Sequence, residues 1–509
     1  MINVSCNTNR YEYEIRALVM GFYPGEELSY NIDEIYEQTE LHGEASVRIL
    51  IRLEDYDINV IIASNNTDTK IADKCVEIIG SKMYRDVLKK VLYRALSAHL
   101  KRELEWGTLT GVRPTKLPMK MLMDGCNADE AIAYMMQEYY CTFNKASLCT
   151  TVAATELRIL NDIQFEKGYS IYIGIPFCPT VCTYCSFSST PVSGIPGAES
   201  LMEDYVTALE KECKSVRDIY PDKSITSIYI GGGTPTALNE TQLARLMDIV
   251  RENFPVDTVW EYTVEAGRPD SINEEKLRIL KSGGVTRISV NPQTMKQDTL
   301  NSIGRKHTVE ETVEAFKLAR SLGFDNINMD LIAGLQGETV EDFEKTLEYI
   351  DELQPDSFTV HSLVVKRASM YRQQKEQLKN EADSADKAKD ADSESAGVVD
   401  RMLTKAADYA VSSEYFPYYM YRQKNKAGLG DNPVLENVGY SKQGKEGIYN
   451  ILIMEEKQTI IALGAGASSK IVTKNNDDDN DYRIERVANV KNIREYINRI
   501  DEMIERKKR

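Results

Sequence analysis

Three cysteines, Cys178, Cys182 and Cys185, lie close together in the run Cys-Pro-Thr-Val-Cys-Thr-Tyr-Cys. Cysteine thiolates are the usual protein ligands of [4Fe–4S] clusters. Three thiolates leave one of the four irons without a protein ligand, and a catalytic metal centre needs such an open position. The spacing therefore predicts an iron–sulfur cluster with one iron free to bind a small molecule.

Zinc and incidental buried thiols are the two other interpretations of this triplet. Structural zinc takes four ligands, typically in pairs, and no fourth cysteine or histidine lies nearby in the sequence. The other six of the nine cysteines are scattered, which is typical of buried thiols in a reducing compartment. The four histidines are His42, His99, His307 and His361.

The elements that would position the triplet alternate between β-rich and helical patterns from residue 166 to about 370. Such alternation favours parallel βαβ units with helices packed outside. Six units fit a partial (β/α)6 barrel as well as a doubly wound sheet, and in either fold the chemistry lies at the C-terminal ends of the strands. The six β-rich runs are 171–175, 225–230, 260–265, 286–290, 326–331 and 357–361.

Further polar and glycine residues follow these runs in turn. The run Gly231-Gly232-Gly233-Thr234 comes after the second β-rich run, and glycines let backbone groups approach a ligand closely, although such a run is also an ordinary turn. Carboxylates can accept hydrogen bonds from hydroxyl or ammonium groups, and an arginine can pair with a carboxylate. The polar residues at or after later strand ends are Glu265, Gln293, Arg305 and Asp330.

The cysteine spacing, with Tyr184 before the last cysteine, resembles the signature of the radical-SAM superfamily. The resemblance implies that the open iron binds S-adenosylmethionine (SAM), which is split into methionine and a 5′-deoxyadenosyl radical that takes a hydrogen from the substrate. The Gly-Gly-Gly-Thr-Pro-Thr run is similar to that of coproporphyrinogen oxidases and HemW proteins. By this resemblance Tyr172 is both a catalytic residue and a SAM contact, and the other SAM contacts are Tyr184, Gly232, Gly233, Thr234, Glu265, Gln293, Arg305, Asp330 and Val364.

Over nearly its whole length the chain resembles the HemZ-type oxygen-independent coproporphyrinogen III oxidases, also called dehydrogenases. The segments that carry this likeness are 109–116, 418–424, 435–440 and 463–468. It implies oxidative decarboxylation of two propionates of coproporphyrinogen III to vinyl groups, which gives protoporphyrinogen IX, with a flavodoxin- or ferredoxin-like reductant. The substrate is a tetra-anion, so its candidate ligands, which are alternatively ordinary surface charges, are Lys366, Arg367, Arg422 and Lys424.

Phe187 marks a departure from the well-studied oxidases, which carry one more cysteine at this position. HemW-type haem chaperones carry phenylalanine there, so the alternative function is haem binding without decarboxylation, with His361 as the candidate axial ligand. A third, weaker idea is RNA binding by the N-terminal region, because the turn 110–116 carries two basic residues.

The composition sets the remaining expectations. With 509 residues the chain exceeds one ordinary domain, and a net charge of −17 disfavours nucleic acid and anionic membranes as partners. No apolar run is long enough to span a membrane and the N-terminus lacks a signal-peptide pattern, so we expect a cytoplasmic protein. The expected regions are an N-terminal α/β domain (1–165), a radical-SAM core barrel (166–370), a low-complexity charged insertion (371–397) and a C-terminal α+β extension (398–509), in which 448–454 is read as a strand.

Overall fold

The computed structural model describes residues 1–32, 46–64, 68–187, 189–363, 385–422, 435–474 and 482–508, and within 385–396 it describes the backbone. By its internal contacts the chain divides into two compact units. The first unit comprises Met1–Thr151, Lys379–Asp400 and Tyr421–Glu436, and the second comprises Val152–Leu378, Arg401–Met420 and Asn437–Arg509. This division joins segments that are distant in sequence, whereas the boundaries at 165, 370 and 397 stay predictions.

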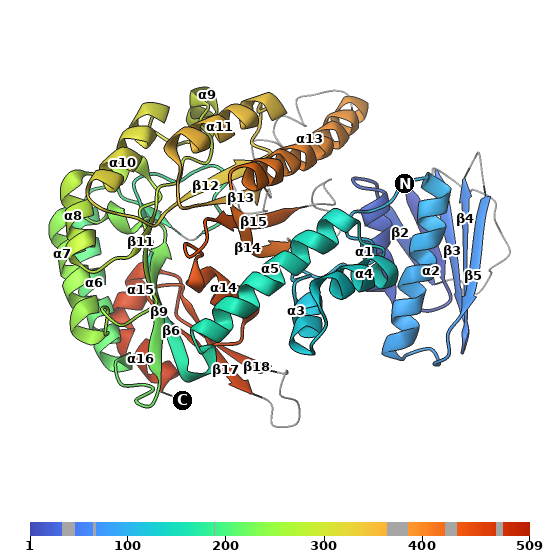
Figure 1. Cartoon of the computed structure of the whole chain (residues 1–509), viewed down its shortest axis with the longest axis horizontal. Coiled ribbons are helices and arrows are strands. Elements are labelled where there is room, and N and C mark those ends of the chain that lie inside the picture. Colours follow the sequence, from blue (N-terminus) through green and yellow to red (C-terminus); the bar gives the residue numbers. More distant parts are fainter. Residues whose placement is uncertain are drawn as a thin grey trace. The chain divides into compact units, whose positions relative to one another are not determined.

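A five-stranded sheet in the order β2-β1-β3-β4-β5 forms the core of the first unit (Figure 1). Strand β1 pairs in parallel with β2 and with the central strand β3, and β3, β4 and β5 pair antiparallel. The apolar residues of α1 and α2 join this core. The bounds are β1 Ile2–Cys6, α1 Glu12–Phe22, β2 Leu28–Ile32, β3 Val47–Leu53, β4 Asp57–Ser64, β5 Asp68–Lys74, α2 Lys82–Leu100, α3 Lys116–Met123, α4 Ala128–Tyr139 and α5 Phe143–Asp162.

Six parallel strands in the second unit carry the predicted site. They neighbour one another in sequence order, β6-β9-β10-β11-β12-β13, within an eleven-stranded sheet. A doubly wound sheet would reverse its strand order at a switch point, so the sequential order confirms the partial (β/α)6 arrangement. The strands are β6 Gly168–Ile175, β9 Ser224–Gly232, β10 Glu261–Glu265, β11 Arg287–Ser289, β12 Ile327–Ala333 and β13 Ser357–Ser362.

Helices follow these strands and form an outer layer (Figure 1). Three of them begin at capping boxes, in which Asn239, Thr308 and Thr339 each exchange hydrogen bonds with the residue three positions on. Their apolar residues face the sheet, as an amphipathic helix requires. The bounds are α6 Ala198–Val216, α7 Glu240–Asn253, α8 Glu274–Ser282, α9 Gln297–Ser302, α10 Val309–Ser321 and α11 Val340–Leu353.

C-terminal strands extend the sheet at both edges, because β16 pairs in parallel with β6 and β15 pairs antiparallel with β13. The expected strand over 448–454 is wrong, since these residues form helix α14. The buried carboxylate of Glu261 accepts hydrogen bonds from the backbone N–H groups of Ile448 (2.6 Å) and Tyr449 (3.1 Å), which stabilises the N-terminus of a helix. The bounds are α13 Ala385–Ser412, β14 Phe416–Arg422, β15 Glu436–Ser441, α14 Ile448–Glu455, β16 Ile460–Leu463, β17 Ser468–Lys474, β18 Tyr482–Ala488, α15 Ile493–Asn498 and α16 Ile500–Lys507.

The predicted charged insertion is partly helical, and the helices can be compared with the length that a membrane span requires. Helix α13 begins at Ala385, inside the predicted insertion, while residues 371–384 of that insertion lie outside the described residues. Among the helices of the described ranges, none combines the length and the apolar character needed to cross a membrane.

Candidate active site

The loop that carries Cys178 is fixed to the neighbouring strand by main-chain hydrogen bonds. After β6 the chain continues through the short strand β7 (Phe177–Cys178), which pairs with β8 (Thr190–Pro191). The N–H of Gly233 donates to the carbonyl of Ile175 (2.8 Å), and the N–H of Thr234 donates to the carbonyl of Phe177 (2.7 Å). The glycine run after β9 therefore positions the start of the cysteine loop.

Cys182 and Cys185 lie on the next turn of the same loop. The N–H of Cys185 donates to the carbonyl of Cys182 (3.1 Å), and the N–H of Thr183 donates to that of Ile303 (3.0 Å). Cys182 is buried, and its Sγ accepts a hydrogen bond from Nη1 of Arg268 at 3.4 Å. The second and third cysteines are thus held by their own turn and by groups that follow β10 and α9.

The donor set fits a four-iron cluster rather than a single ion. Within the ranges that the structure describes, no three His, Cys, Asp or Glu side chains converge closely enough to hold one metal ion. A [4Fe–4S] cluster does not require this, because each thiolate binds a different iron. Burial raises the pKa of the Cys178 and Cys185 thiols, and deprotonation by a bound cluster would overcome this cost.

The glycine run packs so closely against its neighbours that a side chain at Gly231 or Gly233 would collide with them. A Cβ added to Gly233 would lie 2.5 Å from the carbonyl oxygen of Phe177, and one added to Gly231 would lie 2.7 Å from Cδ of Glu265. Gly232 has φ +110°, a conformation that other residues avoid. Glycine is therefore required at this turn by close packing, and the SAM contacts at Gly232, Gly233 and Thr234 stay predictions.

Tyr172 lies on β6 beside this turn. A Cβ on Gly232 would lie 3.3 Å from its hydroxyl oxygen, and its ring stacks on those of Tyr229 (6.2 Å between centroids) and Tyr449 (6.0 Å). The hydroxyl of Tyr229 donates to Oε1 of Glu265. Burial raises the pKa of the Glu265 carboxyl to about 7, although the Tyr229 hydrogen bond acts in the opposite direction.

Asp330 lies in the middle of β12 and is surrounded by donors. Its Oδ2 accepts from Nδ2 of Asn291 and its Oδ1 accepts from Nδ2 of Asn328, both at 2.8 Å, and Nε2 of His361 lies 3.7 Å from Oδ1. Burial acts to raise the pKa of this carboxyl, but the interactions with His361 and Asn328 outweigh it and the pKa lies below its usual value. Asp330 is therefore held as a carboxylate.

Gln293 occupies a left-handed backbone conformation, with φ +68°. Its N–H donates to the carbonyl of Asp330 and its own carbonyl accepts from Ile332, each at 2.9 Å, so the neighbouring strand β12 maintains the conformation. Non-glycine residues in this region cost about 1–3 kcal/mol and cluster at functional sites. The strain fits the predicted role of Gln293 at the SAM site.

Arg305 is buried and reaches several groups of the site. Its Nη1 donates to the carbonyls of Asn291 (2.6 Å) and Gly267 (3.2 Å), and its Nη2 donates to the hydroxyl of Tyr184 (3.2 Å). Its Nε is buried without a hydrogen-bond partner in the described structure. A buried guanidinium with a spare donor suits an anionic ligand such as a carboxylate.

The structure thus places most predicted residues within or directly after β6, β9, β10 and β12, and it adds others that sequence reasoning missed. Arg268, Asn291 and Tyr229 contact predicted site residues directly. The signal for Arg268 was its position directly after the third strand end, but a lone arginine in a loop resembles ordinary surface charge.

The predicted substrate residues are placed differently. Val364, Lys366, Arg367 and Lys424 lie outside the described residues. Arg422 belongs to the first unit, where its guanidinium lies 5.0 Å from the ring centroid of Trp106 and donates to the carbonyl of Leu109 (2.6 Å). These contacts disfavour Arg422 as a ligand for substrate carboxylates.

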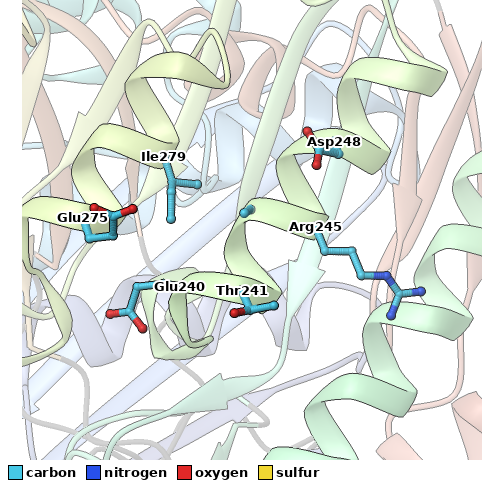
Figure 2. Close-up of a pocket in the computed structure, with 7 residues that line it drawn as sticks. Glu240, Thr241, Arg245, Asp248, Glu275 and Ile279 are labelled. Carbon is cyan, nitrogen blue, oxygen red and sulfur yellow. The ribbon is translucent and has the colours of Figure 1, made fainter.

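A surface hollow of about 500 Å³ lies among the outer helices α7 and α8 (Figure 2). Its walls are mostly charged, and none of the predicted site residues lines it. The hollow is therefore separate from the strand-end site. Its lining residues are Glu240, Thr241, Ala244, Arg245, Asp248, Glu275 and Ile279.

Known proteins resemble this chain in sequence. The family description "Radical SAM superfamily" matches residues 172–350, and members of that superfamily bind a [4Fe–4S] cluster and SAM. The oxygen-independent coproporphyrinogen-III oxidase-like protein HemZ of Bacillus subtilis is 38% identical over 93% of this chain and 92% of its own length. The haem chaperone HemW of the same organism is 37% identical over 40% of this chain and 52% of its own. The structure of coproporphyrinogen III oxidase (HemN) from Escherichia coli aligns with a TM-score of 0.47 and 21% identity over 68% of this chain and 73% of that one.

Proposed function

Because the chain belongs to the HemZ family of radical-SAM proteins, we propose that it oxidatively decarboxylates coproporphyrinogen III to protoporphyrinogen IX. The observation that carries the proposal is the extent of the similarity. The likeness to HemZ spans 93% of the chain, whereas the likeness to HemW spans 40%. The parts outside the core, where a substrate would be distinguished, therefore follow the HemZ type.

When bound, the cluster and SAM would supply one-electron transfer and hydrogen-atom abstraction. This chain's residues have the task of binding and orientation. Cys178, Cys182 and Cys185 would hold three irons. The glycine run offers its backbone to the SAM methionine portion, while the spare donor of Arg305 suits the methionine carboxylate.

Two acidic side chains would orient the rest of SAM. The Asp330 carboxylate, already fixed by Asn291 and Asn328, can accept hydrogen bonds from ribose hydroxyls. Glu265, which the Tyr229 hydroxyl orients, can accept from a hydroxyl or from the ammonium group. Tyr172 lies between this carboxylate and the glycine run, where it can contact the cofactor and help exclude water.

The proposed reaction of the substrate balances in atoms and electrons. Loss of one hydrogen atom from the β-carbon of a propionate, then of carbon dioxide and one electron, leaves a vinyl group. The electron needs an acceptor, and the cluster needs a flavodoxin- or ferredoxin-like reductant. Lys366, Arg367 and Lys424 stay candidates for the substrate carboxylates.

Haem binding without decarboxylation is the second candidate function, and Phe187 is the observation that favours it. Its side chain is 72% exposed beside the cysteine loop, at the position where HemW-type proteins also carry phenylalanine. His361 is less suited to bind haem iron than the sequence suggested. Its Nδ1 lies 2.8 Å from Nδ2 of Asn437, and its Nε2 faces the Asp330 carboxylate at 3.7 Å.

An anaerobic assay tests the proposal. The reconstituted protein is given SAM, dithionite and coproporphyrinogen III, and vinyl products and 5′-deoxyadenosine are measured. We expect both from the wild type and from Cys126→Ala, which removes a partly exposed thiol of the first unit, and neither from Cys182→Ala. Deoxyadenosine without any vinyl product would contradict the decarboxylase.

A haem titration separates the second candidate. Tight haem binding by the wild type, with transfer to an acceptor protein and no vinyl product, would support a chaperone. If haem binding is lost in His361→Gln, the histidine is the axial ligand despite its contacts. No haem binding would exclude the chaperone.

A further inference from the structure

Arg268, which follows β10, is the most completely engaged side chain near the cysteine loop. The residue is 3% exposed, and its five N–H donors meet five acceptors. Nε and Nη2 bind the two oxygens of Asp270 at 2.9 and 2.7 Å. Nη2 also donates to the hydroxyl of Thr180 (3.0 Å), and Nη1 donates to the Thr180 carbonyl (3.2 Å) and to Sγ of Cys182 (3.4 Å).

This arrangement fixes the direction of the N–H group that faces sulfur. A bidentate arginine–carboxylate pair sets the plane of the guanidinium, and Asp270 provides that pair. Thr180 lies between Cys178 and Cys182 in the chain, so its two bonds tie the same guanidinium to the backbone of the cysteine loop. The hydrogen bond to Cys182 is therefore preformed in the protein without bound cofactors.

We propose that Arg268 is a positioning residue that donates a hydrogen bond to the cluster thiolate of Cys182 and so raises the reduction potential of the cluster. The proposal rests on the assignment of Cys182 as a cluster ligand under the proposed function. Hydrogen bonds to the sulfur ligands favour the reduced state of an iron–sulfur cluster, because reduction adds negative charge that the donor stabilises. A higher potential makes the cluster easier to reduce, and this reduction must precede SAM cleavage.

The short-range hydrogen bond, rather than net charge, carries the effect. Asp270 neutralises Arg268 at 2.7 Å, so the pair adds little charge at longer range. The second buried guanidinium, that of Arg305, donates to carbonyls and to Tyr184 and makes no hydrogen bond to a cysteine sulfur within the described structure. The two arginines therefore have different tasks: Arg305 offers a spare donor to a ligand, while Arg268 serves the cluster.

An EPR-monitored redox titration of the reconstituted protein tests the inference. Arg268→Gln should shift the one-electron reduction equilibrium about tenfold toward the oxidised cluster, which corresponds to about 59 mV for one electron. Arg268→Lys keeps the positive charge but lacks the paired N–H groups of the guanidinium. Its shift in reduction potential should therefore be smaller than that of Arg268→Gln. Arg278→Gln removes an exposed arginine paired with Glu274 on α8 and should leave the potential unchanged.

The alternative outcomes are distinct. A fully loaded Arg268→Gln protein with the wild-type potential would overturn the inference, as would a potential shifted equally by Arg278→Gln. Loss of iron from both Arg268 variants would make Arg268 a requirement for assembly and would also overturn the tuning role. Retention of a full cluster in Cys182→Ala would refute the ligand assignment itself, whereas an unshifted potential in a Cys182-ligated protein would refute this inference alone.

Discussion

The two halves of the candidate site are held in different ways. The cysteine loop and the glycine run are fixed by main-chain hydrogen bonds and by the buried guanidinium of Arg268. The carboxylate half, with Glu265 and Asp330, is fixed by hydrogen bonds between side chains. The stability of the backbone-held half should therefore depend chiefly on side-chain size and on the residues packed against it. The stability of the half built from ionisable side chains should depend on pH.

Glu212 of α6 lies at the centre of a buried polar cluster close to β6, the strand that precedes the cysteine loop. Its carboxylate accepts hydrogen bonds from four groups: Nζ of Lys507 (2.6 Å), the Tyr496 hydroxyl (2.6 Å), Nδ2 of Asn489 (2.8 Å) and the N–H of Gly464 (2.8 Å). The hydroxyl of Tyr205, also on α6, accepts from Ala465 and donates to the carbonyl of Gly174, four residues before Cys178. The C-terminal helix α16 thus helps to position β6.

Lys507→Met should cause the largest loss in the free energy of unfolding. Removing one partner of a buried ion pair leaves an uncompensated charge and costs about 3–5 kcal/mol. Urea unfolding of the protein without cofactors measures the loss. The matched control is Lys508→Met at the next position, where an exposed pair with Glu505 contributes about 0–1 kcal/mol. Equal losses in the two variants would show that the buried cluster adds nothing specific.

Gly233→Ala tests the backbone contact between the glycine run and the cysteine loop. The new methyl group would lie 2.5 Å from the Phe177 carbonyl oxygen and 3.0 Å from that of Ile175, so the loop must shift. Overpacking of this kind costs up to about 3 kcal/mol, and SAM affinity should fall with it. Equilibrium SAM binding and urea unfolding measure the two effects. Gly111→Ala, with no atom within 4 Å of the new methyl group, should change neither.

The same contrast explains how far the sequence predicts this site. Cys178, the glycine run and Asp330 were predictable because each follows or ends a β-rich run, and parallel strands bring their ends to one edge. Arg268 and Asn291 were not, because their roles depend on contacts with residues far away in the sequence. The contacts of Arg422 were not predictable for the same reason: its partners, Trp106 and Leu109, are about 300 positions away in the chain.

The C-terminal region shows the same limit for secondary structure. The apolar run 448–454 has no periodicity that separates a buried strand from a buried helix. Its helical state in α14 is stabilised by Glu261, a residue of β10 that caps its N-terminus. Local patterns predicted the six-stranded core, whereas long-range capping decided α14.

Asp330→Asn tests the carboxylate half. The change replaces a carboxylate that accepts two amide hydrogen bonds at 2.8 Å by a neutral amide, one end of which would face a donor. Hydrogen bonds to charged groups contribute about 2 kcal/mol, so SAM affinity and stability at pH 7 should both fall by about that amount. Asn328→Ala, which removes one of the two donors and leaves the charge, should give a smaller loss. An Asp330→Asn protein as stable as the wild type would contradict the hydrogen bonds assigned to the Asp330 carboxylate.

The pH dependence of the Asp330 effect has a defined sign. Its pKa is lower in the folded protein than the usual value of about 3.9, so the unfolded chain binds the proton more tightly. The stability that Asp330 provides is therefore present above about pH 4 and is lost as the pH falls through the folded pKa. Wild type and Asp330→Asn should accordingly converge in stability under acid conditions.

Glu265 should show the opposite pH dependence of stability. Its pKa of about 7 exceeds the unfolded value of about 4.3, so the folded protein binds the proton more tightly. Its contribution to stability is greatest below about pH 4 and declines as the pH rises to about 7, because over this interval the unfolded chain releases the proton that the folded protein retains. Glu265→Gln cannot ionise and should remove this decline from the pH profile of the unfolding midpoint.

Ligand binding should show the reverse dependence. A SAM ammonium group favours the ionised carboxylate, so SAM affinity of the wild type should rise between pH 6 and pH 8, while that of Glu265→Gln should stay level across this interval. Asp330 is ionised throughout this range and cannot produce such a rise. A pH-dependent SAM affinity that persists in Glu265→Gln would therefore place the titrating group elsewhere and remove Glu265 from the ammonium site.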